Sequence, residues 1–290
     1  RQPGAGRPVA RSAQLAIKPE YKNIEGVKVR YASAGKSGGP TALLLNPLPQ
    51  SILAFDPRWE RLCEQLRVVA LDLPGFGRSE GGLEFMTFKA QGDFLRAFVD
   101  ELDLSDIQIV GPDVGLGAVL HYVIHSSHKA ASLVIGDGPG IAPSSNGSVI
   151  DKMVDSAFWR MVFRVAGAEA FVAAANALCY VNYARSYAEV TDYVASYAGR
   201  IHQVTQWFAN YPQSLACVDP YLADIDLPVK VFWGDLDQLL FVDNGERLHK
   251  RLKRSDFTVF DHCGHLSYQV KSDNFAQMVM HWVGAGHKTV

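Results

Sequence analysis

The sequence has few cysteines, and they are not grouped. The 290 residues include four, which lie far apart without a CxxC pair or metal-ligand spacing: Cys63, Cys179, Cys217 and Cys263. This usage predicts free thiols in a reducing compartment, so we expect a cytoplasmic protein. The chain starts at Arg1 without a methionine, which leaves secretion open.

Excess charge and long apolar runs are also missing. A formal net charge of -2 argues against a nucleic-acid or other polyanionic partner. The dense basic cluster at residues 250–254 closes an expected helix, where cations suit the carbonyl end. No uninterrupted apolar run reaches the roughly 18 residues of a membrane span, so we expect no membrane partner. The composition, 48% apolar and 20% charged, is that of a globular protein.

Short apolar strands alternate with amphipathic helices along most of the chain. The expected strands cover residues 14–18, 27–33, 41–45, 67–71, 107–110, 132–136, 229–233 and 257–260. The main expected helices cover residues 58–66, 88–102, 118–126, 244–252 and 274–283. This alternation predicts an α/β fold, with a mostly parallel central sheet and helices on both faces.

The alternation is interrupted between residues 138 and 221. This stretch has no strand signal, only helical patterns rich in alanine, valine and aromatic residues. We interpret it as a helical cap over the strand ends, where open α/β sheets bind ligands. The remaining segments, 1–137 and 222–290, then form the core.

The strand at 107–110 runs into a Gly-x-Asp-x-Gly turn and a helix. Such a sharp turn strains its central residue, Asp113, and lifts the side chain clear of the sheet. Gly111 and Gly115 lie where a Cβ would collide across the turn. The helix directs free N–H groups at the site, which favours negative charge there. Asp113 is therefore a candidate nucleophile, and a helix-capping aspartate is the alternative.

Three further motifs follow other expected strands. They are residues 46–49, residues 234–237 and the Gly264-His265 pair. Parallel strands bring all of them to one edge of the sheet. The chain order of nucleophile, acid and histidine resembles the α/β-hydrolases, over nearly the whole chain. With aspartate as the nucleophile, the sequence resembles the epoxide hydrolases and the haloalkane or haloacid dehalogenases.

The resemblance implies a triad of Asp113, His265 and Asp237. A carboxylate can attack a saturated carbon and leave an ester on itself. His265 would then activate water, and Asp237 would orient the imidazole. The backbone N–H groups of Leu48 and Val114 would form the oxyanion hole.

Some neighbouring residues compete for these roles. Asp235 or Asp137 is an alternative acid, but the family spacing of three residues from the strand-ending glycine favours Asp237. His262 is an alternative histidine, although the Gly-His pair favours His265.

A metal or a cofactor is not expected. His121 and His125 are four residues apart on the expected helix, but the sequence offers no third ligand beside them.

The sequence departs from these families at several positions. Asn46 and Pro47 replace the usual His-Gly, and Pro47 stiffens the loop. Leu48 and Val114 stand where dehalogenases carry halide-binding Asn and Trp. Phe208 replaces the second cap tyrosine of epoxide hydrolases.

We expect a small apolar substrate, and a homodimer is left open. The expected substrate-binding residues are Asn46, Trp159, Tyr180, Tyr183, Trp207, Phe208 and Tyr211, with any of the three tyrosines as the proton donor. An epoxide ranks first, because halide donors are missing and the cap is rich in tyrosine. The alternatives are a haloalkane or haloacid, an ester or C–C bond, and a non-catalytic binding protein.

Overall fold

The structure, a computed structural model, describes residues 15–144 and 147–287. The strands in these residues are β1 (Glu20–Ile24), β2 (Val27–Gly35), β3 (Thr41–Leu45), β4 (Arg67–Leu71), β5 (Ile107–Pro112), β6 (Ala130–Gly136), β7 (Val229–Gly234) and β8 (Ser255–Phe260). They form one sheet in the order β1-β2-β4-β3-β5-β6-β7-β8. The β1–β2 and β2–β4 pairs are antiparallel, and the remaining pairs are parallel. The predicted α/β class, with a mostly parallel sheet, is confirmed.

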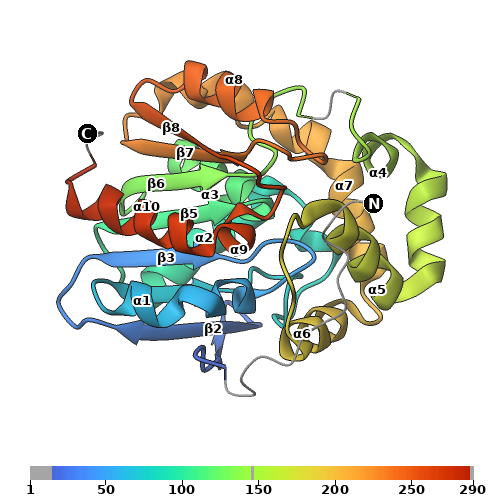
Figure 1. Cartoon of the computed structure of the whole chain (residues 1–290), viewed down its shortest axis with the longest axis horizontal. Helices are drawn as coiled ribbons and strands as arrows, with labels where there is room; N and C mark the ends of the chain where they lie inside the picture. The colour runs from blue at the N-terminus through green and yellow to red at the C-terminus, as the bar shows by residue number, and fades with distance from the viewer. Residues whose placement is uncertain (1–14, 145–146, 288–290) are drawn as a thin grey trace.

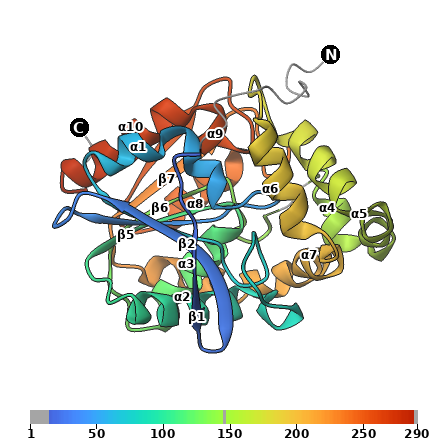
Figure 2. The same ribbon diagram turned by 90° about the horizontal axis from the view of Figure 1, so that it is seen from below.

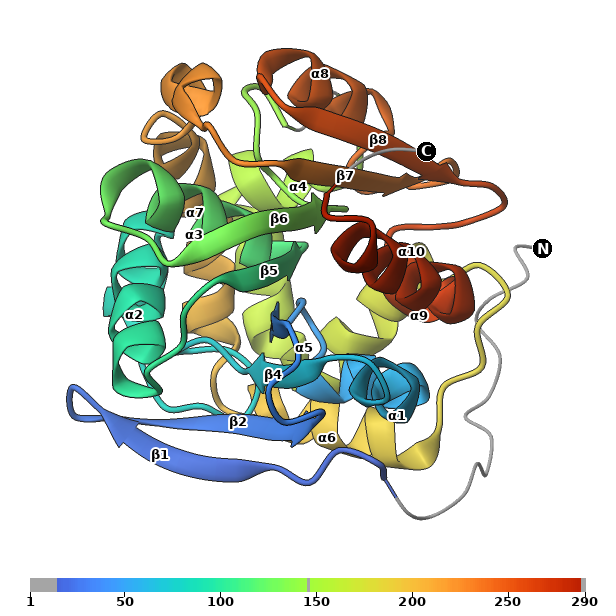
Figure 3. The same ribbon diagram turned by 90° about the vertical axis from the view of Figure 1, so that its left-hand side faces the viewer.

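Helices cover both faces of the sheet. They are α1 (Trp59–Cys63), α2 (Phe88–Glu101), α3 (Val114–His125), α8 (Asp243–Arg251), α9 (Ser267–Val270) and α10 (Ser272–Gly284), with short 3-10 turns η1 (Ile52–Arg58) and η2 (Leu83–Phe85). Figure 3 shows α1 and α10 on one face, and α2 and α3 on the other. β3 lies between β4 and β5 with every residue buried, which its uninterrupted apolar sequence predicts.

The expected strand at residues 14–18 is wrong. Residue 14 lies outside the described residues, and residues 15–19 form no strand. The backbone N–H of Ile17 donates to Asp56 Oδ1 at 2.9 Å, so this segment is tied to η1 instead of to a strand. Pairing begins at β1, which forms a hairpin with β2 across Glu25 and Gly26.

The inserted segment folds as a layer of helices beside the strand ends. Its elements are α4 (Asp151–Asp155), α5 (Ala157–Cys179), α6 (Tyr187–Tyr197), α7 (Ile201–Leu215) and η3 (Asp219–Asp224). Figures 1 and 2 show α4 to α7 together on one side of the molecule, with α5 at its outer edge. We call α4 to α7 the cap.

Helix α5 is the longest and most apolar helix of the cap. By length and composition it is apolar enough to cross a membrane, with a mean hydropathy of 1.4 over its best window. Only 22% of that window is buried. Gly167 (φ 84°, ψ -177°) breaks the helix into two parts.

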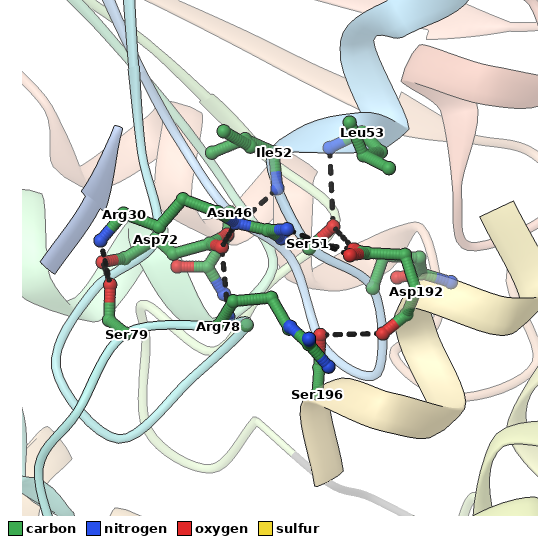
Figure 4. A network of polar contacts seen from close by, with 12 residues as sticks. Arg30, Asn46, Ser51, Ile52, Leu53, Asp72, Arg78, Ser79, Asp192 and Ser196 are labelled. Carbon is green, nitrogen blue, oxygen red and sulfur yellow. Dashed lines mark hydrogen bonds and ion pairs between the residues drawn. The ribbon is translucent and has the colours of Figure 1, made fainter. Parts of the chain in front are cut away.

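An ionic network fastens the cap to the core (Figure 4). Arg30 of β2 donates from Nε to Asp72 Oδ2 at 2.6 Å. Its two terminal nitrogens donate to the carboxylate of Asp192 on α6, at 2.7 and 3.0 Å. Ser51 donates from Oγ to the same carboxylate at 2.5 Å. Because Arg30 and Asp72 are buried, α6 is held by charges that water screens little.

Candidate active site

Asp113 lies at the turn between β5 and α3, in a backbone conformation that non-glycine residues rarely adopt (φ 51°, ψ -121°). The turn depends on glycine at two positions. A Cβ on Gly111 would lie 2.7 Å from Cγ2 of Val119, and one on Gly115 would lie 2.9 Å from the Cβ of Leu45. The sequence therefore forces the sharp turn that presents Asp113 at the carboxyl edge of the sheet.

Three side chains from different strand ends meet at this edge. His265 Nε2 lies 3.2 Å from Asp113 Oδ1, and His265 Nδ1 lies 2.7 Å from Asp237 Oδ2. The other oxygen of Asp237 accepts the backbone N–H groups of Leu239 and Leu240, at 2.8 and 2.9 Å. Asp237 is thus held through one oxygen by the chain that follows it, and its other oxygen contacts the imidazole.

The two carboxylates govern the charge of His265. Burial lowers its pKa, but the charge of Asp237 and the hydrogen bonds to Asp113 and Asp237 outweigh burial. The pKa of His265 is therefore held well above its ordinary value. The imidazole is an imidazolium while both carboxylates are ionised, and it becomes a stronger acid when Asp113 loses its charge.

Asp137, the alternative acid at the end of β6, faces other partners. Its Oδ1 accepts the N–H of Gly234 at 3.2 Å, and Ser267 contacts its Oδ2 through N at 3.0 Å and Oγ at 2.5 Å. Burial, together with the charge of Asp237, raises the pKa of Asp137 to about 8. Asp137 therefore holds the loop after His265, and its burial favours the neutral acid.

The other competitors, half-buried Asp235 and exposed His262, bond elsewhere. Asp235 accepts the N–H of Cys263 at 2.9 Å, and the His262 side chain is 76% exposed beside Asp261. The potential ligand atoms of Asp235, Asp261 and His262 lie within 4.8 Å of one another, the one such group among the described residues. These side chains bond to one another and to the local backbone, so their arrangement does not require a bound ion.

The loop after β3 places an N–H donor on Asp113. The backbone N–H of Leu48 donates to Asp113 Oδ2 at 2.5 Å, and Val114 is the first residue of α3. Asn46 has a different place from the one expected. It is fully buried, and its Oδ1 accepts the N–H of Leu73 at 2.8 Å. Asn46 therefore braces the loop and does not line the cavity described next.

A cavity of about 200 Å³ opens from Asp113 and His265 into the cap. Four of the expected substrate-binding residues line it, and they are Trp159, Trp207, Phe208 and Tyr211. The structure adds lining residues that the sequence analysis missed, among them Lys152, Phe163, Phe171, Cys179, Leu239 and Leu240. The two leucines could have been found from the sequence, because they lie only two and three residues after Asp237.

Two of the three candidate tyrosines lie outside the cavity lining. Tyr180 donates from its hydroxyl to Gln269 Oε1 at 2.7 Å, and Tyr183 donates to Glu189 Oε1 at 2.5 Å. These buried bonds turn both phenols toward the interface between cap and core. Among the three, Tyr211 alone lines the cavity with Asp113 and His265.

Comparisons with known proteins agree with this fold. A family described as "alpha/beta hydrolase fold" matches residues 43–272. The dihydrolipoyllysine-residue acetyltransferase component of the acetoin cleaving system of Cupriavidus necator is 24% identical, over 91% of this chain and 69% of its own. A haloalkane dehalogenase loop variant from Bradyrhizobium elkanii has a TM-score of 0.79 at 20% identity, covering 93% of this chain and 97% of its own. An epoxide hydrolase has a TM-score of 0.78 at 20% identity, covering 93% of this chain and 99% of its own.

Proposed function

Because the chain belongs to the α/β-hydrolase fold family, we propose that it is a hydrolase with Asp113 as its nucleophile. The observation that carries the proposal is that the two carboxylate oxygens of Asp113 have different partners. Oδ2 accepts the Leu48 N–H, and Oδ1 faces the His265 imidazole. A helix-capping aspartate would accept an N–H of the first turn of its own helix with its side chain, but the Asp113 carboxylate makes no such bond to α3.

In the first half-reaction, Oδ1 of Asp113 attacks a saturated carbon of an epoxide. The new C–O bond forms as the ring C–O bond breaks, and the ring oxygen leaves as an alkoxide. Tyr211 gives this alkoxide its phenolic proton, because it is the candidate tyrosine that lines the cavity. The product is an ester on Asp113, and Oδ2 becomes its carbonyl oxygen, held by Leu48 N–H.

In the second half-reaction, water hydrolyses the ester. The charge of Asp113 is gone, so the pKa of His265 falls and the imidazolium releases a proton to solvent, which it takes back once Asp113 is charged again. The neutral imidazole can then act as a base. Water gives a proton to His265 and adds to the ester carbon, while the N–H of Leu48 stabilises the oxyanion. His265 returns the proton to the leaving alcohol. Asp113 is then released as the acid, and its proton restores Tyr211.

The cavity supports an apolar epoxide as the substrate. Beyond Asp113, His265 and Tyr211, its lining is almost entirely aliphatic and aromatic. The alkoxide of an opened epoxide stays on the carbon chain, so no ion has to leave a dry site. Dehalogenation is the second candidate, since the indoles of Trp159 and Trp207 line the same cavity and could hold a halide.

Isotope labelling tests the nucleophile. In a single turnover with styrene oxide in heavy-oxygen water, mass spectrometry should find the label on the peptide that contains Asp113. His265→Gln should accumulate the ester as a mass adduct, because attack needs no base but hydrolysis does. His262→Gln is the matched control, and it should turn over normally. Turnover of any substrate in an epoxide, haloalkane and ester panel without label on Asp113 would contradict the mechanism. A lack of turnover on the whole panel would favour a non-catalytic binding protein.

A further inference from the structure

The outer face of α5 exposes an unusual amount of apolar surface. Phe158 is 59% exposed, Met161 52%, Val165 84% and Trp159 39%. We call these four residues the α5 face. Single exposed apolar residues are normal on soluble proteins, but a contiguous apolar patch marks an interaction site. The ring centroids of Phe158 and Trp159 are 5.7 Å apart, so the patch is continuous at its N-terminal end.

The α5 face adjoins the opening of the cavity. Most of the cavity lining is buried, and its exposed members are Val149, Lys152 and Trp159. Trp159 therefore belongs both to the cavity and to the α5 face. Lys152 Nζ lies 5.3 Å from the centre of the Trp159 ring, which places a cation at the same rim. A molecule bound to the α5 face would meet the cavity opening directly.

Charge and shape indicate what kind of partner fits. Residues 157–167 contain Arg160 and Arg164 and no acidic side chain. On α4, Asp151 and Asp155 offset Lys152, so the local positive charge lies on the first half of α5. Arg160 is half-buried and donates to the backbone oxygens of Met153 and Val154. Arg164 donates from Nε to Thr205 Oγ1 but stays exposed beside the apolar face. An apolar helix face with an exposed cation at its border is typical of helices that lie in the interface of an anionic lipid surface.

The break at Gly167 decides between lying on a membrane and crossing it. A spanning helix must satisfy its backbone hydrogen bonds within the segment. Gly167 has non-helical angles in the middle of the apolar stretch, and α5 packs on α6 and α7 along its inner side. Only the outer side is available, which suits a helix lying flat at an interface.

We propose that the α5 face docks the protein on an anionic lipid surface, with the cavity opening turned toward the lipid. This arrangement would let an apolar substrate pass from the lipid into the cavity without crossing water. The proposal does not rest on the aspartyl-ester mechanism, because docking needs no turnover.

Vesicle flotation tests the proposal with the full chain. The protein should float with phosphatidylcholine vesicles that contain phosphatidylserine, and less with phosphatidylcholine alone. Combining Phe158→Ser with Val165→Ser should weaken binding by about tenfold or more, since both side chains lose apolar burial. The matched control combines Leu83→Ser with Val259→Ser, which are 51% and 45% exposed outside the cap. The control should float like the unchanged protein.

Arg164→Gln tests the electrostatic part. Its binding to the phosphatidylserine vesicles should fall toward the level of the neutral ones. The proposal is overturned if the protein stays at the bottom of the gradient with both lipids, or if the cap and control variants bind equally. It is also overturned if light scattering shows a dimer that the cap variant splits, with no flotation. In that case the α5 face binds a second copy of the chain.

Discussion

Asp192→Asn should destabilise the protein far more than the loss of a surface ion pair. The change removes the charge that α6 offers to Arg30, whose side chain is 5% exposed. Burial lowers the pKa of Arg30, but the charges of Asp72 and Asp192 outweigh it and raise the pKa. The guanidinium therefore stays charged and keeps only Asp72 as its anionic partner.

The expected cost follows from the burial of this pair. Removing one partner of a buried ion pair costs about 3–5 kcal/mol, and we take the lower figure because asparagine keeps one acceptor oxygen. At roughly 2–4 °C per kcal/mol for a chain of this size, the melting temperature should fall by about 6–12 °C. Differential scanning calorimetry measures this directly.

Asp93→Asn is the matched control for the same assay. It breaks the pair with Lys89, whose side chain is 69% exposed, so the expected cost is at most about 1 kcal/mol. High salt should leave the Asp192→Asn difference nearly unchanged, because buried charges are little screened. If the two variants melt within about 2 °C of each other, the network does not fasten the cap as we argue.

Two further predictions concern the acids beside His265. Asp237→Asn should lower kcat by about 10⁴-fold, while Asp137→Asn should lower it far less, because of these two acids only Asp237 bonds the imidazole. Steady-state kinetics measures both, and a larger loss in Asp137→Asn would move the acid to β6. The raised pKa of Asp137, from 3.8 to about 8, means that its stabilising contribution is complete below pH 4 and is lost as pH rises through 8. Between pH 5 and pH 9, the free energy of unfolding of Asp137→Asn should therefore rise by at least about 1 kcal/mol relative to that of the unchanged protein. Melting curves at both pH values check this, and a constant difference contradicts it.

The core could be predicted from the sequence because its signals are local. The sequence of β3 predicts a buried strand, and the glycines on either side of Asp113 predict the turn. Once the strands are parallel, their carboxyl ends must share an edge, which brings Asp113, Asp237 and His265 together. The structure places their side chains within hydrogen-bond distance, although their chemical roles stay predictions.

The cap could not be predicted at the same level. Helical periodicity shows which residues share a face, but not what that face meets. Tyr180 and Tyr183 turn toward Gln269 and Glu189, while Tyr211 faces the cavity, and these partners lie far away in the chain or on another helix. The first strand failed for a similar reason. Ile17 is held by Asp56, a contact across 39 residues that no local pattern reveals.

Asp137 and Asp237 show why two equivalent sequence signals can have unequal chemistry. Both follow apolar strands, β6 and β7, which are neighbours in the sheet. Their carboxyl groups therefore lie near each other in a dry site, and two such groups cannot both ionise cheaply. Asp137 bonds Ser267 and the backbone of Gly234, and its raised pKa makes it the neutral one. Of these two acids, Asp237 is then the charged one, and it contacts the imidazole opposite Asp113.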